Sequence, residues 1–194
     1  VAGSRGAGGG ETLLLSGVAV SFMLSSVALL AQFLAGPDQH WRIAHWMMGN
    51  LSARPVSDLL AAAALILPGV ALIGFRSREL DLLLTGEDLA LSRGVDVGRL
   101  RLELFIAVSV ISGAIVSRFG PIGFVGIIAP HICRRLVGAS HRFLFPATLA
   151  FGAGFLVVAD TFARSVWSAS ELPVGVLTAM IGGGFFVALL IKRN

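Results

Sequence analysis

The sequence predicts an all-α, polytopic membrane protein, and three observations lead to this fold class. Hydrophobic residues make up 56% of the 194 residues and charged residues only 13%, against roughly 25% charged in an average soluble domain. The mean hydropathy is +0.87. The charges also fall in short clusters, and the uncharged stretches between them approach the roughly 20 residues that cross a bilayer core. Because backbone groups in lipid must pair within their own segment, these stretches are expected to be helices.

The uncharged stretches predict about six membrane spans. One of these stretches contains Asp160 near its end, and another is apolar until Arg134 and Arg135. The third span could begin near Leu100 if Glu103 lies at the membrane interface. Glycines at positions 120, 123, 126 and 182 to 184 are expected to let helices pack closely, as small residues do in lipid. The predicted spans are residues 13–34, 59–75, 104–117, 121–137, 143–162 and 173–191.

The distribution of Lys and Arg predicts the orientation, because these residues favour the cytoplasmic side. The richer side has Arg5, Arg76, Arg78, Arg93, Arg99, Arg101, Arg134, Arg135, Arg142, Lys192 and Arg193, and the poorer side has Arg42, Arg54, Arg118 and Arg164. The loop 76–101 and the C-terminus are therefore expected in the cytoplasm. This asymmetry also accounts for the pI near 10.9 without a nucleic-acid partner.

The chain is expected to form one transmembrane domain, residues 13–194, after a flexible segment, residues 1–12. That segment is rich in Gly, and Val1 stands where a Met would begin a gene product, so we predict a truncation there. The single cysteine, Cys133, excludes a disulfide within one chain. His131 lies near it, but the other histidines belong to other loops, so we expect a packed or interfacial histidine and no metal site.

The loop 76–101 is too polar to cross a membrane, yet it has helix signals of its own. Thr85 is a predicted N-cap, with Glu87 and Asp88 in the first turn where acids suit the helix dipole. Gly94 is expected to end the helix in the left-handed conformation. The segment therefore predicts a short cytoplasmic helix of about two turns. By helix physics alone, it could be only a connector.

Five stretches of this sequence, in order, resemble the FecCD-type permeases, which carry iron-siderophore complexes, haem or cobalamin through ABC importers. They are residues 46–49 (WMMG), 85–95 (TGEDLALSRGV), 120–138 (GPIGFVGIIAPHICRRLVG) with His141 and Arg142, 159–164 (ADTFAR) and 171–182 (ELPVGVLTAMIG). Gly183 and Gly184 depart from the small residue and proline usual in the family. Family members usually have ten spans, and this chain resembles the last six.

The resemblance implies a permease subunit of the bacterial or archaeal cytoplasmic membrane, in contact with lipid, that works with separate ABC ATPase subunits. The sequence has no phosphate-binding loop of the type G-x-x-x-x-G-K-[ST], so ATP and Mg are expected on the ATPase, with no cofactor or catalytic residue on this chain. The segment 85–95 matches the family's cytoplasmic coupling element. The expected coupling residues are Gly86, Glu87, Ala90, Gly94 and Val95: Glu87 would pair with an ATPase cation, Ala90 would allow close approach, and Gly94 would turn the chain.

The resemblance also implies that a periplasmic or lipid-anchored binding protein docks on the external face, where Arg164 matches a docking arginine. The alternative for Arg164 is pairing with Asp160, four residues earlier. A pathway at a permease homodimer interface is expected to be lined by polar side chains of the first and last spans, Ser21, Ser25 and Thr178. The expected cargo is an iron-siderophore, with cobalamin and haem as alternatives.

Three other function classes remain to be compared. An ion-coupled secondary transporter would need intramembrane charges or broken helices, and Asp160 is the one acidic residue within a predicted span. An intramembrane hydrolase would need motifs such as G-x-S-x-G or H-E-x-x-H, which the sequence lacks. A purely structural membrane subunit stays open.

Overall fold

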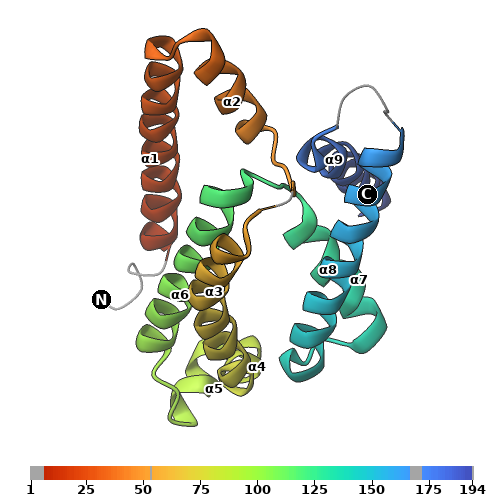
Figure 1. The fold of residues 1–194 in the computed structure, drawn as a ribbon. Coiled ribbons are helices and arrows are strands. Elements are labelled where there is room, and N and C mark those ends of the chain that lie inside the picture. Colours follow the sequence, from red (N-terminus) through yellow and green to blue (C-terminus); the bar gives the residue numbers. More distant parts are fainter. Residues whose placement is uncertain (1–6, 53, 167–171, 194) are drawn as a thin grey trace. The chain divides into compact units, whose positions relative to one another are not determined.

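The structure, a computed structural model, describes residues 7–52, 54–166 and 172–193, and the elements in these ranges are helices (Figure 1). This confirms the all-α prediction. The chain divides into two units, residues 1–44 and 45–194. In chain order the helices are α1 (Ala7–Leu34), α2 (Pro37–Met47), α3 (Val56–Phe75), α4 (Ser77–Leu84), α5 (Glu87–Ser92), α6 (Val97–Phe119), α7 (Val125–Val137), α8 (His141–Val166) and α9 (Val174–Arg193).

The first unit consists of α1 and most of α2. The apolar part of α1, Leu14–Leu34, is long and hydrophobic enough to span a membrane and coincides with the first predicted span. The helix begins earlier, at Ala7, so residues 7–12 of the segment predicted to be flexible are helical. Once a helix has formed, each added residue gains a hydrogen bond, which explains the extension. Residues 1–6 lie outside the described ranges.

Within the described residues, five helices rather than six are long and apolar enough to span a membrane. The prediction for residues 121–137 needs correction. That stretch forms only α7, a helix of 13 residues, which is about 20 Å long and shorter than a hydrocarbon core of about 30 Å. The five long segments are Leu14–Leu34, Val56–Phe75, Val97–Phe119, His141–Ser165 and Val174–Ile191.

The backbone before α7 explains the late start of this helix. Its N-cap is Phe124, which has the left-handed φ of 66°, a conformation uncommon in residues other than glycine. The Phe124 side chain lies against the backbone of Gly182 in α9, where an added Cβ atom would come 2.1 Å from the Cβ of Phe124. Gly182 therefore provides the space for Phe124, as predicted for a glycine that lets helices pack closely.

Although α7 is short, the stretch from the end of α6 to the start of α8 still runs from one end of the second unit to the other. At one end, the backbone N–H of Asn50 donates to the carbonyl of Phe119 (2.8 Å). At the other end, the N–H of His141 donates to the Asp81 carboxylate (2.7 Å). The return between Phe119 and His141 combines irregular backbone with the short α7. Such backbone is tolerated at membrane depth where protein buries it or where it lines a cavity.

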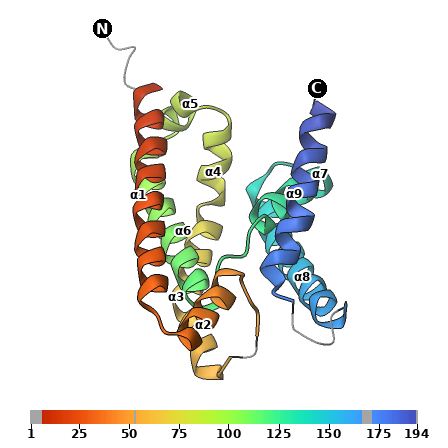
Figure 2. The same cartoon turned by 90° about the horizontal axis from the view of Figure 1, so that it is seen from above.

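Small residues let helices of the second unit approach each other closely. Figures 1 and 2 both show α3 beside α6, and an added Cβ on Gly69 of α3 would lie 2.9 Å from the Ile111 side chain of α6. In a second contact, Gly152 of α8 faces Ala129 of α7. Gly123, Gly126, Gly183 and Gly184 have open space at the Cβ position among the described residues, so the predicted close packing is not seen there.

Candidate functional site

The polar segment 76–101 contains two short helices, α4 and α5, and the first residues of α6. Helices α4 and α5 contact each other and are called here the α4–α5 hairpin. The predicted N-cap role of Thr85 is wrong. Thr85 is the C-cap of α4, and its hydroxyl donates to the carbonyl of Leu82 (2.6 Å). The N-cap of α5 is instead Gly86, whose φ of +123° suits glycine alone. The hydroxyl therefore serves the end of one helix and the glycine permits the turn into the next.

Gly94 ends α5 as predicted. Its φ is +81°, its N–H donates to the carbonyl of Leu91 (2.9 Å), and the next N–H, of Val95, donates to the carbonyl of Ala90 (3.0 Å). These two bonds form a Schellman motif, which satisfies carbonyls at a helix end. The chain then turns sharply toward α6, where Asp96 caps the first turn by accepting from the N–H of Arg99 (3.0 Å).

A small apolar cluster holds the α4–α5 hairpin against α6. Ala90 is 0% exposed and Val95 is 8% exposed. Ala90 was expected to allow close approach of a partner, but its methyl group packs inside this cluster, and Val95 is buried there as well. Both side chains therefore position α5 on its own chain. The other members are Val97 and Leu100, with Leu82, Leu83 and Leu104 packed against them.

Ion pairs join the α4–α5 hairpin to α6. Glu87, predicted to pair with a cation of an ATPase, pairs in this chain with Arg101 of α6 at 2.9 Å, and both side chains are more than half exposed. Arg76 lies between two carboxylates, Glu79 and Glu103, at 2.7 Å from each. The Glu87–Arg101 and Arg76–Glu103 pairs therefore connect α5 and the junction of α3 and α4 to α6.

A third connection, to α8, centres on Asp81 of α4. Its carboxylate accepts from the backbone N–H of His141 (2.7 Å) and from the hydroxyl of Ser140 (3.0 Å), and it lies 2.7 Å from Nδ1 of the His141 ring. Burial acts to raise the pKa of Asp81, but the hydrogen bonds from His141 and Ser140 outweigh it and hold the pKa below its usual value. Asp81 thus caps the N-terminus of α8 from another helix.

Sequence reasoning missed this cap. The usual N-cap residue lies directly before its helix, whereas Asp81 is 60 positions away from His141. The available signals were Ser140 and His141 at the start of an apolar run, and Asp81 followed by three leucines in α4.

At the opposite end of the second unit, three chain segments meet at glycines, called here the glycine crossing: Gly49, Gly120 and Gly175. An added Cβ would come within 2.4 Å of the Pro121 carbonyl oxygen at Gly49, 2.0 Å of the Trp46 oxygen at Gly120, and 2.2 Å of the Met48 oxygen at Gly175. The N–H of Gly175 also donates to the carbonyl of Gly49 (3.2 Å). Backbone therefore packs directly on backbone at this end.

Arg164 lies at the same end, near the C-terminus of α8. Its Nε donates to the Asp160 carboxylate (2.8 Å) and its guanidinium also donates to the carbonyl of Leu51 (3.2 Å). The alternative prediction, pairing with Asp160, is thus seen in the structure. The Arg164 side chain remains 40% exposed. Arg54 donates to the carbonyl of Arg118, near the C-terminus of α6 and 64 positions later in the chain.

The predicted pathway residues differ in exposure. Ser21 and Ser25 lie on one exposed face of α1 and line a groove of about 440 Å³ together with Gly17. The Ser21 hydroxyl donates to the carbonyl of Gly17 (2.8 Å). Thr178 of α9, by contrast, is 0% exposed and its hydroxyl donates to the carbonyl of Gly175 (3.1 Å). Thr178 therefore does not reach a pathway surface in this conformation.

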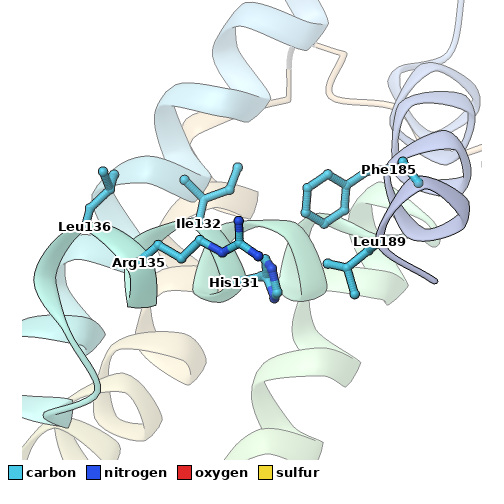
Figure 3. A pocket seen from close by; sticks show the side chains of 7 residues that line it. His131, Ile132, Arg135, Leu136, Phe185 and Leu189 are labelled. Atoms are coloured by element: carbon cyan, nitrogen blue, oxygen red, sulfur yellow. The ribbon is translucent and has the colours of Figure 1, made fainter. Parts of the chain in front are cut away.

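A pocket of about 670 Å³, lined by both polar and apolar side chains, lies between parts of α7 and α9 (Figure 3). His131 and Arg135 come from α7, and Phe185 and Leu189 come from α9 across the pocket. The His131 ring packs edge-on against Phe185 with ring centroids 5.7 Å apart. The prediction of a packed histidine agrees with this contact. Among the described residues, no three potential metal ligands gather in one place.

Comparisons with known proteins agree on one family. The sequence model of the FecCD transport family matches residues 1–192 of this chain. The chain is 43% identical over 183 residues to a cobalamin import system permease protein of Halobacterium salinarum, covering 94% of this chain and 49% of that protein. It is 36% identical over 182 residues to a hemin transport system permease protein of Yersinia pestis, covering 94% and 54%. The chain thus spans about half the length of the curated relatives it matches.

A solved structure shares the fold. It shows an inward-facing conformation of a protein assigned to the metal-chelate type of ABC transporters, with a TM-score of 0.84 and 34% identity over 93% of this chain and 60% of that one. The five membrane-length helices and this family indicate a multi-pass membrane protein. Since the sequence model of this family matches nearly the whole chain, the chain belongs to the FecCD transport family.

Proposed function

We propose that this chain contributes membrane-spanning helices to the permease subunit of an ABC importer for a metal chelate, with an iron-siderophore as the cargo. One observation supports the proposal most strongly. The α4–α5 hairpin lies outside the membrane-length helices and is bonded to two of them, to α6 through Glu87 and Arg101 and to α8 through Asp81. A partner that moves the hairpin would therefore move two spans together.

The hairpin end is the cytoplasmic end in this proposal. Six of the ten arginines of the richer side, including Arg78, Arg93 and Arg142, lie in segment 76–101 or at the start of α8, which favours the cytoplasm. The ABC ATPase subunits, with Mg and ATP, would bind there. Nucleotide-driven closure of two ATPases would displace the hairpins of two permease copies and exchange inward and outward openings.

Arg164 is the proposed contact for a substrate-binding protein at the opposite end. Its guanidinium is held by Asp160 and by the carbonyl of Leu51, so it is oriented in advance at a low entropic cost for binding. In this proposal a carboxylate of the binding protein approaches the exposed Arg164 side chain. The change Arg164→Glu would then weaken docking in reconstituted membranes and leave membrane insertion intact; unaltered docking would remove this role.

A pull-down of the co-expressed ATPase tests the coupling proposal. The variant Gly94→Val, which disturbs the Schellman turn, and the charge reversal Glu87→Lys are compared with Gly36→Val, a glycine with open space at its Cβ position. The first two should lose most ATPase association and the third should keep it. Full association in both hairpin variants would contradict coupling through this segment.

One observation favours a second cargo, cobalamin. The relative from Halobacterium salinarum, at 43% identity, is named a cobalamin import permease, whereas a Bacillus subtilis relative at 36% identity is named an Fe(3+)-citrate import permease. Uptake of a labelled ferric siderophore, cobalamin and hemin into proteoliposomes with the complete transporter separates these cargoes. ATP-dependent uptake of the siderophore alone is the expected result, and uptake of cobalamin alone would replace it.

A further inference from the structure

The arginines of segment 76–101 fall into two groups. Arg76, Arg99 and Arg101 each lie within 2.9 Å of a carboxylate of the chain itself. Among the described residues, Arg78 and Arg93 have no carboxylate at ion-pair distance, and both side chains are exposed. Three of the five arginines in this segment are therefore neutralised by acids of the chain. Arg78 and Arg93 remain without an acidic partner among the described residues.

The two remaining cations line the same recess. Arg78 comes from α4 and Arg93 from the C-cap of α5, and between them is a cavity of about 540 Å³. Its floor is apolar, with Leu82 half-buried and Val95 buried. Its one acid, Glu79, is already paired with Arg76 at 2.7 Å. The recess therefore presents two uncompensated guanidinium groups at the rim of an apolar hollow.

We infer that this recess binds a carboxylate-bearing segment of the ATPase partner. Guanidinium groups prefer carboxylates, which they can bind through two parallel hydrogen bonds. An apolar floor inside a charged rim is also the usual arrangement of a protein interface. The recess includes Gly94, so it continues directly into the turn proposed for coupling. This inference rests on the proposed function and specifies the chemistry of its partner.

The alternative occupant is an anionic lipid headgroup, which would bind the same guanidinium groups. A phosphate at the membrane surface needs only exposed cations and gains little from a hollow. The buried Val95 and half-buried Leu82 would instead accommodate an apolar side chain next to the carboxylate. The shape of the recess thus favours a protein segment, and the experiment distinguishes the two occupants.

The test measures the affinity of the purified ATPase for the complete permease in detergent without lipid. The double variant Arg78→Glu and Arg93→Glu should bind about tenfold more weakly or worse at low salt, because opposed charges meet at the rim. The difference should shrink as the salt concentration rises. The double change to Lys keeps the charge and should bind with an affinity between those of the unaltered protein and the Glu variant.

The matched control is Arg42→Glu, a charge reversal on exposed α2 that should leave ATPase affinity unchanged. An affinity of the double Glu variant within about twofold of the unaltered permease would overturn the inference. So would a loss seen only in nanodiscs with phosphatidylglycerol and not in detergent, since the arginines would then bind lipid. If the unaltered permease fails to bind any ATPase, the proposed function fails, and the inference with it.

Discussion

The two ends of the second unit are held together by different forces. At the hairpin end, charged and hydrogen-bonded side chains connect α4 and α5 to α6 and α8, with Asp81 and the Glu87–Arg101 pair as the main links. At the glycine crossing, backbone packs on backbone and leaves no room for a side chain. Side-chain bonds can break and form again at small cost, whereas a backbone crossing cannot be rearranged without unpacking. The first end is therefore suited to movement and the second to serve as a fixed point.

The largest effect is expected at the glycine crossing. Gly120→Ala places a Cβ 2.0 Å from the Trp46 carbonyl oxygen at a residue with a φ of +74°, so the cost is about 3 kcal/mol or more from overpacking and backbone strain together. The thermal midpoint of the detergent-purified protein and its yield as a monodisperse species measure this. Gly113→Ala, a helical glycine with open space, is the control and should be neutral or slightly stabilising.

A smaller loss is expected at Asp81. Asp81→Ala removes the cap of α8 and leaves the His141 N–H without its acceptor, a cost of about 1–2 kcal/mol. Hydrogen exchange should speed up in α4 and in the first turn of α8 but not at the glycine crossing. Equal acceleration at both ends would contradict the idea that they are held separately.

The contribution of Asp81 also depends on pH. Its hydrogen bonds hold the pKa in the folded state below the usual value, which is near 3.9 in an unfolded chain. The stabilisation is therefore present above about pH 4 and is lost as the pH falls through the lower pKa of the folded state. The difference in thermal midpoint between the unaltered protein and Asp81→Asn should narrow below about pH 4. A difference that stays constant down to pH 3 would show that the charge has no role.

Gly94→Ala probes the turn of the hairpin by backbone strain alone, since its Cβ position is open. A left-handed conformation costs an L-residue about 1–2 kcal/mol. The control, Gly98→Ala in the first turn of α6, makes only an ordinary contact with Asp96. Faster proteolysis within residues 85–96 of the Gly94 variant is the expected result, and unchanged cleavage in both variants would contradict it.

The smallest effect belongs to Glu87. Its pair with Arg101 is more than half exposed, so Glu87→Gln should cost less than about 1 kcal/mol and less still at high salt. Thermal midpoints at low and high salt give the measurement. A loss as large as that of Asp81→Ala would mean that the hairpin is held mainly by this exposed pair.

Prediction from the sequence succeeded where the cause is local. The uncharged run that became Leu14–Leu34 is found by its length and hydropathy, and Gly94 ends α5 because only its own φ is required. It failed where the cause lies elsewhere in the chain. Thr85 looked like an N-cap by its neighbours, and residues 121–137 looked long enough to span a membrane, but the left-handed Phe124 shortened that helix against Gly182 of α9.

By itself, the sequence determined that the chain is helical, that it has several membrane-length segments and that its charges concentrate in the polar segment between α3 and α6, because these properties depend on residue type and spacing along one helix. Only the tertiary structure decided which partners those residues take. Ala90 is buried, Glu87 meets Arg101 and Asp81 caps a helix 60 positions away. These contacts depend on how separate helices approach each other, since each side chain bonds to whatever the packed fold places within a few ångströms.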